Sequence, residues 1–315
     1  MTPIQRWVKE IDMSDSNTGA PGVDTNAPPP IITESPVEVA AGVFVIPDGR
    51  VPLVPNIGVI VGDRAALVVD SGLGPRNGAI ARQVAKDLAG DRPLFLTLTH
   101  FHPEHGFGAQ SFVDATILYN RAQHEEFRQK ADGYLEQFRG FGGAVAQQLE
   151  GVEFVDPQIV YDGNADLDLG GRRVQLRTWG AAHSRGDQVI YLPNERVLFT
   201  GDLVENRFYP IFPYVPPYDV DVNGDNWIAV IEALHGLDPG IVVPGHGEVG
   251  DSDLLVTTDE VLKMLRAETK RLAAEGRSAD ETIAILGPEL QTRYPDWDTS
   301  EPWRIATAVQ TFRAQ

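Results

Sequence analysis

Cysteine is absent from this chain of 315 residues, and basic residues are few: 26 lysines and arginines stand against 45 aspartates and glutamates, a net charge of −19. Without cysteine the chain can form no disulfide and offers no thiolate to a metal, so a metal site here must use imidazole and carboxylate groups. Such ligands favour zinc, with iron or manganese as the alternatives. Because no cluster of lysine and arginine is present to neutralise phosphates, we expect no nucleic-acid partner.

Long apolar runs are missing as well. The chain has no stretch of about 18 apolar residues that could span a membrane, and residues 1–34 lack the basic-then-apolar pattern of a secretory signal. We therefore expect no membrane partner and, by default, a cytoplasmic location. The hydrophobic content of 42% is that of a globular protein, and the chain is long enough to bury a sizeable core.

Histidine is also scarce, with seven in the whole chain, yet three of them fall within six consecutive positions. An apolar run at 94–98 leads into this segment, which contributes three imidazoles and one carboxylate: His100, His102, Glu104 and His105. A short buried strand that ends in such a segment delivers metal ligands to a cleft at its carboxyl end. We therefore interpret the segment as a metal-binding loop rather than as a surface turn.

Two further histidines share this setting. His183 and His246 both stand in glycine-flanked loops after apolar runs, which predicts that they join the same site. His124 and His235 fall in helix-like stretches without ligand spacing, and we assign them to structure.

Residues 1–34 are rich in serine, asparagine, glycine and proline. Such a segment cannot bury enough apolar surface to fold alone, so we predict a partly flexible N-terminal arm. After it, a first group of strands is predicted at 43–46, 58–61, 66–69, 94–98 and 115–119, and a second at 159–161, 165–169, 173–178, 189–192, 196–199 and 241–243. Helices are predicted at 76–88, 121–138, 225–237, 253–274, 279–286 and 302–312.

An insertion at 208–218 is rich in aromatic residues and too rich in proline for a central strand. A loop of this length either covers a substrate or contacts a second subunit of a homodimer, and the sequence does not separate the two. If it covers a substrate, an apolar or aromatic small molecule is favoured, and the contacting residues are Tyr209, Phe212, Tyr214 and, from the next helix, Trp227.

Several separate motifs between residues 37 and 250 together resemble the metallo-β-lactamase superfamily: Asp70 at a strand end, His100-x-His102-x-Glu104-His105, His183, Gly201-Asp202 and Gly245-His246-Gly247. The resemblance implies an α+β fold, an αββα sandwich of two mixed β-sheets with helices on the outer faces. It also implies a metallo-β-lactamase-like domain at 35–250, with the helices of 251–315 packed on the same domain.

The resemblance further implies a ligand set for one or two zinc ions. His100, His102 and His183 would hold the first metal, His105 and His246 the second, and Asp202 would bridge both. Asp70 and Asp187 would support the ligands, Asp70 by accepting the other N–H of a ligand histidine.

Glu104 departs from the pattern, because the family usually has an aspartate there that ligates the second metal. Glutamate places its carboxylate one methylene farther from the backbone, and zinc tolerates only a few tenths of an ångström in ligand distance. Glu104 is therefore a ligand in a shifted geometry, a general base, or a group that supports the ligands.

These residue types suit a metal-dependent hydrolase, because a metal held by neutral imidazoles lowers the pKa of bound water from 15.7 to about 7 and gives hydroxide at neutral pH. Glu104 or Asp202 could then take or return the proton. The predicted substrate is a small-molecule ester, lactone, lactam or thioester. The alternatives are a hydrolytic dehalogenase that displaces halide from an activated aromatic ring, and a degenerate member that binds metal without catalysis.

Overall fold

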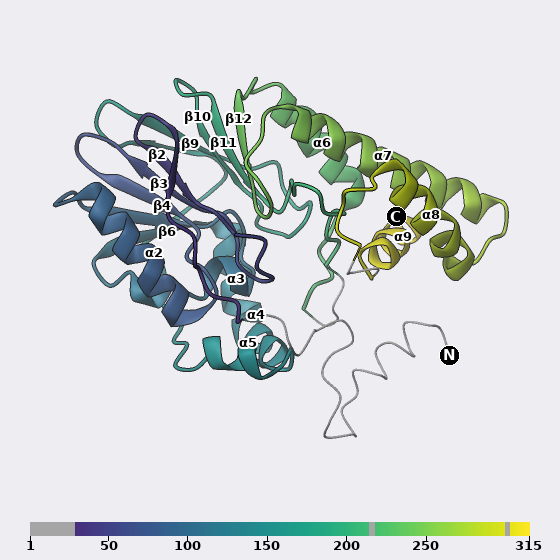
Figure 1. Cartoon of the computed structure of the whole chain (residues 1–315), viewed down its shortest axis with the longest axis horizontal. Helices are drawn as coiled ribbons and strands as arrows, with labels where there is room; N and C mark the ends of the chain where they lie inside the picture. The colour runs from purple at the N-terminus through teal and green to yellow at the C-terminus, as the bar shows by residue number, and fades with distance from the viewer. Residues whose placement is uncertain (1–28, 214–217, 300–302) are drawn as a thin grey trace.

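The computed structural model describes residues 29–213, 218–299 and 303–315. Two β-sheets lie face to face, with helices along both outer sides (Figure 1). This arrangement confirms the predicted α+β fold, an αββα sandwich of two mixed sheets. No helix in these described ranges is both long and apolar enough to cross a membrane.

The first sheet has seven strands in the order of the sequence. They are β1 (Val37–Ala40), β2 (Val43–Ile46), β3 (Ile57–Val61), β4 (Ala66–Val69), β5 (Leu94–Thr97), β6 (Ala115–Asn120) and β7 (Ile159–Tyr161). Strands β1 to β4 pair antiparallel, whereas β4 to β7 pair parallel. The parallel part matters for function, because parallel strands end at one edge of a sheet.

The second sheet has five strands in the order β12-β11-β10-β9-β8. They are β8 (Ala165–Asp168), β9 (Arg173–Arg177), β10 (Val189–Leu192), β11 (Val197–Gly201) and β12 (Ile241–Pro244). Only β11 and β12 are parallel. The prediction that 159–161 belongs to this second group was wrong: β7 pairs with β6, with Ile159 opposite Leu118, a non-local pairing that the local sequence does not encode.

Alternating side chains place the central core between the two sheets. In β2, Val43 and Val45 face the second sheet, whereas Ile46 packs toward the helices on the other side. The same period of two holds in β4, where Leu67 and Val69 face inward. One apolar layer therefore joins the sheets and fixes their relative position.

Two helical layers cover the sandwich (Figure 1). On the first sheet lie α2 (Gly74–Ala89), α3 (Pro103–Gly106), the short 3-10 helix η1 (Ala109–Ser111), α4 (Arg121–Arg139) and α5 (Gly143–Gln148). On the second lie α6 (Gly224–His235), α7 (Asp253–Ala274), α8 (Ala279–Arg293) and α9 (Trp303–Ala314). The last three share one buried core with α6 and the second sheet.

Helix α8 is longer than predicted. The sequence suggested an end at residue 286, before Pro288, but the helix continues through the proline to Arg293. Leu286 and Leu290 are both fully buried in the core beneath it. Packing on both sides of the proline outweighs the backbone hydrogen bond that proline cannot make.

The predicted arm lies mostly outside the described residues. Its described end is attached to the body, because Asn77 of α2 accepts a hydrogen bond from the backbone of Ile32 and donates one to the carbonyl of Pro30. The side chain of Ile32 is buried in the core under the first sheet.

Candidate metal centre

Strand ends bring the predicted ligands together. Asp70 directly follows β4, and the segment from His100 to His105 follows β5, its parallel neighbour. In the second sheet Asp202 directly follows β11, and His246 comes just after β12, again a parallel pair. Because parallel strands end at the same edge, each sheet delivers its polar side chains to one side of the sandwich.

The first cluster combines His100, His102, His183 and Asp202, all buried. The Nδ1 atom of His102 lies 3.0 Å from His100 Nε2 and 3.2 Å from His183 Nε2. Asp202 Oδ2 lies 3.9 Å from His100 Nε2 and 3.8 Å from His183 Nε2. Ligands at 2.0–2.1 Å from a tetrahedral zinc stand roughly 3.3–3.4 Å apart, so the imidazole spacing is close to that of a metal site.

The second cluster combines Glu104, His105, Asp202 and His246, with one ligand atom of each within 4.8 Å of the others. Asp202 Oδ1 lies 3.3 Å from His105 Nε2 and 3.8 Å from His246 Nε2. Asp202 thus presents one oxygen to each cluster. Glu104 is the second residue of the short helix α3, and from there its longer side chain still reaches the group.

Several buried polar atoms in these clusters have no hydrogen-bond partner among the described residues. They include both carboxylate oxygens of Asp202, Nε2 of His105 and Oε2 of Glu104. Leaving such groups unsatisfied is costly in a protein interior, and most buried polar atoms have partners. One divalent cation in each cluster would satisfy these atoms, so the residues present fit the predicted metal.

The outward-facing nitrogens of two imidazoles are fixed by the surrounding fold. His105 Nδ1 lies 3.0 Å from Asp70 Oδ2, and His183 Nδ1 lies 2.9 Å from the carbonyl of Ile211. Asp70 is itself held by the backbone N–H of Thr99, at 2.7 Å. Such partners orient a ligand ring and select its tautomer, which is the role expected for Asp70.

Asp187 acts on the loop rather than on a histidine. Its carboxylate accepts hydrogen bonds from the backbone N–H groups of Ala182 and Ser184 and from the Ser184 hydroxyl. These two residues flank His183, so Asp187 sets the path of the loop that carries this ligand.

Gly245 makes room for the bridging carboxylate. A Cβ atom at this position would lie 1.9 Å from Asp202 Oδ1, closer than any real contact. The glycine before His246 is therefore required for Asp202 and the β12 loop to approach each other.

Burial and the charges of the centre together set the pKa values of its imidazoles. Burial lowers the pKa of His183 to about 3, and burial with the charge of His105 holds that of His100 well below its ordinary value. For His105 burial alone would lower the pKa, but the carboxylates of Asp202 and Asp70 outweigh it and raise the pKa well above the ordinary value. Without metal, a proton is therefore favoured more on His105 than on His100 or His183.

Sequence reasoning missed the residues that hold the His246 loop. Asn56 Nδ2 donates to the carbonyls of Pro244 and Gly247, at 3.0 and 2.7 Å, and Asp48 Oδ2 accepts from the Gly247 N–H at 2.8 Å. Both side chains are buried in the loop between β2 and β3. No motif marks them, because their partners lie almost two hundred positions away.

Three of the four aromatic residues predicted to contact substrate are buried in the core that the second sheet shares with helices α6 to α9. Phe212 and Trp227 are fully buried and pack on each other, and Tyr209 is nearly so. The Trp227 ring also contacts that of His183, and its N–H donates to the carbonyl of Leu203. Tyr214 lies outside the described residues, and a substrate contact for any of the four stays a prediction.

The fold and the two ligand clusters define a metal-binding protein of the αββα sandwich class. The family model of the metallo-beta-lactamase superfamily matches residues 50–246, more than half of the chain. The chain therefore belongs to the metallo-beta-lactamase superfamily, whose members are mostly hydrolases. This confirms the resemblance found in the sequence motifs.

Two curated relatives show how far the similarity extends. The chain is 29% identical over 192 residues to the alpha subunit of a 2,4-dinitroanisole O-demethylase from Nocardioides sp. (strain JS1661), a match that covers 59% of this chain and 51% of that protein. It is 27% identical over 211 residues to an acyl-coenzyme A thioesterase from Bos taurus, covering 61% of this chain and 72% of the relative. The chain thus spans only about half of the demethylase subunit.

Solved structures share the fold at low identity. A sec-alkylsulfatase from Pseudomonas sp. superimposes with a TM-score of 0.67 at 15% identity, over 89% of this chain and 49% of that one. A metallo-beta-lactamase from Pontibacter korlensis gives a TM-score of 0.55 at 16% identity, over 73% of this chain and 99% of that one.

Proposed function

We propose that this protein is a zinc-dependent hydrolase with two metal ions, acting on an uncharged small-molecule ester, lactone, lactam or thioester. The observation that carries the proposal is the pair of buried clusters joined by Asp202, whose two oxygens face one cluster each. The thioesterase relative, of which 72% is matched, supports the acyl class. A divalent metal held there would act as a Lewis acid and lower the pKa of bound water to about 7.

The chain's own residues supply the geometry and the proton path. Asp202 gives one oxygen to each cluster and so sets the distance between them. The buried imidazoles exclude solvent from the reacting atoms. Glu104 Oε2 is buried and unpaired within the described chain, and its carboxylate converges on the second cluster, so its first role is that of a ligand of the second metal. Its other role is that of a base, which takes a proton from the attacking water and returns it to the departing alcohol, amine or thiol, and substitution separates the two.

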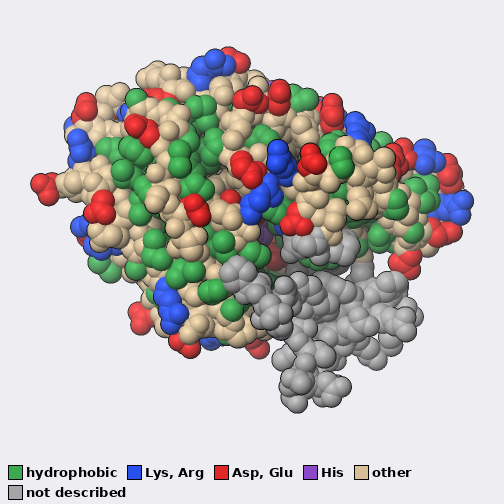
Figure 2. All heavy atoms as spheres, viewed as in Figure 1, with side chains coloured by type: hydrophobic (Ala, Val, Ile, Leu, Met, Phe, Trp, Pro, Cys, Tyr) green, Lys and Arg blue, Asp and Glu red, His purple; other side chains and the backbone are tan. Residues whose placement is uncertain are grey.

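Charge supports the choice of an uncharged substrate. The chain carries a net charge of −19, which slows the approach of anions. On the face shown in Figure 2, acidic and basic side chains are interspersed, without a broad basic patch.

A second candidate is displacement of a leaving group from an activated aromatic ring by water. The relative named for 2,4-dinitroanisole favours it, because that compound is a nitro-activated aryl ether. Both candidates need a nucleophilic water and differ only in the carbon attacked.

A substrate panel tests the proposal. The zinc-loaded protein is assayed with nitrophenyl esters, lactones, lactams, simple thioesters, 2,4-dinitroanisole and halogenated nitrobenzenes, alongside Asp202→Asn. We expect turnover of an acyl substrate that chelation abolishes, zinc restores and Asp202→Asn lacks. Turnover of the aryl compounds alone would establish the second candidate, and no turnover by fully loaded protein would overturn both in favour of a non-catalytic metal-binding member.

A further inference from the structure

His102 has a buried carboxylate on the side of its ring that faces away from the other ligands. Its Nδ1 atom points to His100 and His183, whereas Nε2 lies 3.6 Å from Asp219 Oδ1. The side chains of His102 and Asp219 are 8% and 10% exposed. Nε2 has no hydrogen-bond partner in the described parts of the chain, and a shift of roughly 0.6 Å would bring the two atoms to ordinary hydrogen-bond distance.

Helix α4 holds Asp219 in this place. The buried Tyr134 donates its hydroxyl hydrogen bond to Asp219 Oδ1, and Lys130 Nζ lies 3.8 Å from the same oxygen. A buried carboxylate is costly unless such partners compensate it. The position of Asp219 is therefore built into the fold.

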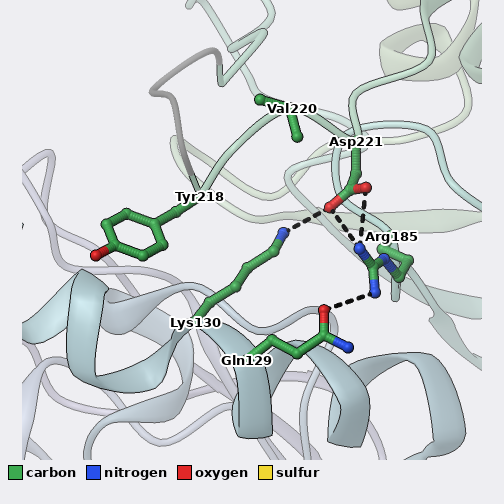
Figure 3. Close-up of a pocket in the computed structure, with 6 residues that line it drawn as sticks. All are labelled: Gln129, Lys130, Arg185, Tyr218, Val220 and Asp221. Atoms are coloured by element: carbon green, nitrogen blue, oxygen red, sulfur yellow. Dashed lines mark hydrogen bonds and ion pairs between the residues drawn. The ribbon is translucent and has the colours of Figure 1, made fainter.

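The segment around Asp219, residues 218–222, is docked on the same helix (Figure 3). Asp221 accepts from Lys130 at 2.9 Å and from Arg185 at 3.1 Å. The ring of Tyr218 lies against Gly133, where an added Cβ atom would come within 2.1 Å of it. A glycine inside a helix is unfavourable by itself, and here it allows this close contact.

The second cluster has the same arrangement, because Asp70 faces the outward nitrogen of His105. We propose that Asp219 is the positioning residue of the first metal site: it accepts the Nε2–H of His102 and thereby fixes the tautomer that presents Nδ1 to the metal. Segment 218–222 thus completes the first site as Asp70 completes the second. The proposal rests on the metal assignment of the proposed function but not on the reaction catalysed.

The test compares Asp219→Ala and Asp219→Asn with the matched control Asp221→Asn, which alters the same docked segment without facing His102. Zn²⁺ and Co²⁺ affinities are measured by chelator competition, together with the visible absorption spectrum of the Co²⁺ form. We expect Asp219→Ala to weaken one of two sites by about 10- to 100-fold and to change the Co²⁺ spectrum. Asp219→Asn should lose less affinity than Asp219→Ala but more than about twofold, because its amide oxygen still accepts the N–H while the charge that favours this bond is gone.

Asp221→Asn should bind Zn²⁺ and Co²⁺ with affinities within about twofold of wild type. Losing a residue that orients a metal ligand typically lowers the affinity by at least about tenfold. Equal losses of metal affinity in Asp221→Asn and Asp219→Ala would overturn the proposal, because they would show that both variants act by loosening the docked segment 218–222. Wild-type affinity and a wild-type Co²⁺ spectrum in both Asp219 variants would also overturn it. If Asp219→Ala fails to fold, Asp219→Asn and Tyr134→Phe decide by the same readouts. Absence of metal binding in wild type would instead remove the metal assignment itself, whereas bound metal without turnover would leave this proposal standing.

Discussion

Asp70 Oδ2 lies 3.0 Å from His105 Nδ1, although 35 positions separate the two residues in the sequence. Asp70 adopts a left-handed backbone conformation, with φ at 69°, which is uncommon for a residue other than glycine and least costly for aspartate and asparagine. The parallel pairing of β4 and β5 brings the two strand ends together, so the strand order of the sheet determines how this ligand is oriented.

Asp70→Asn tests that relationship. The amide loses the charge that favours an N–H at Nδ1, so we expect metal binding at the second cluster to weaken by about 10- to 100-fold. Asp87→Asn, on the exposed face of α2, is the control and should leave affinity unchanged. Equal affinities in the Asp70 variant and wild type, measured by chelator competition, would remove Asp70 from the site.

Gly245→Ala tests the close approach of the β12 loop to Asp202. The new methyl group would overlap Asp202 Oδ1, so the carboxylate must move and metal at both clusters should be lost. Gly240→Ala, before the same strand, meets no atom nearer than 3.7 Å and should retain wild-type metal content. Two bound ions in the Gly245 variant would show that Asp202 does not bridge.

Glu104 variants separate its two roles. If Glu104 ligates the second metal, Glu104→Gln lowers metal content by one ion per chain, whereas Glu104→Asp retains or raises it. If it acts as the base, both variants keep their metal and lose rate by about 10²- to 10⁴-fold, the usual contribution of general base catalysis. Because its carboxylate converges on the second cluster, we expect the loss of one ion. Unchanged metal content together with unchanged rate would exclude both roles.

Metal affinity should depend on pH. The pKa of His105 in the metal-free protein is raised, against the effect of burial, by Asp202 and Asp70. Below that pKa the imidazole is protonated and the metal must displace the proton, so affinity falls as pH falls, by about tenfold per pH unit for one proton. Calorimetry in buffers of different ionisation enthalpy should detect proton release. Affinity independent of pH, without proton release, would contradict this account.

The sequence was sufficient to predict the strand ends and the ligands that follow them, because a short apolar run followed by His100 and His102 is a local signal. It was equally sufficient for α7, whose apolar period is regular. It could not place β7 in the first sheet, since pairing with β6 depends on a distant strand. Asp219 and Asn56 were missed for the same reason: each acts on a residue more than a hundred positions away and belongs to no motif.

The central claim is that two metal sites share Asp202. The most direct test is elemental analysis of metal per chain, on protein purified without added metal and then equilibrated with Zn²⁺, for wild type and Asp202→Asn. The account predicts two zinc ions per wild-type chain and a clear loss in the variant. A single ion in wild type, or two ions retained by Asp202→Asn, would contradict it.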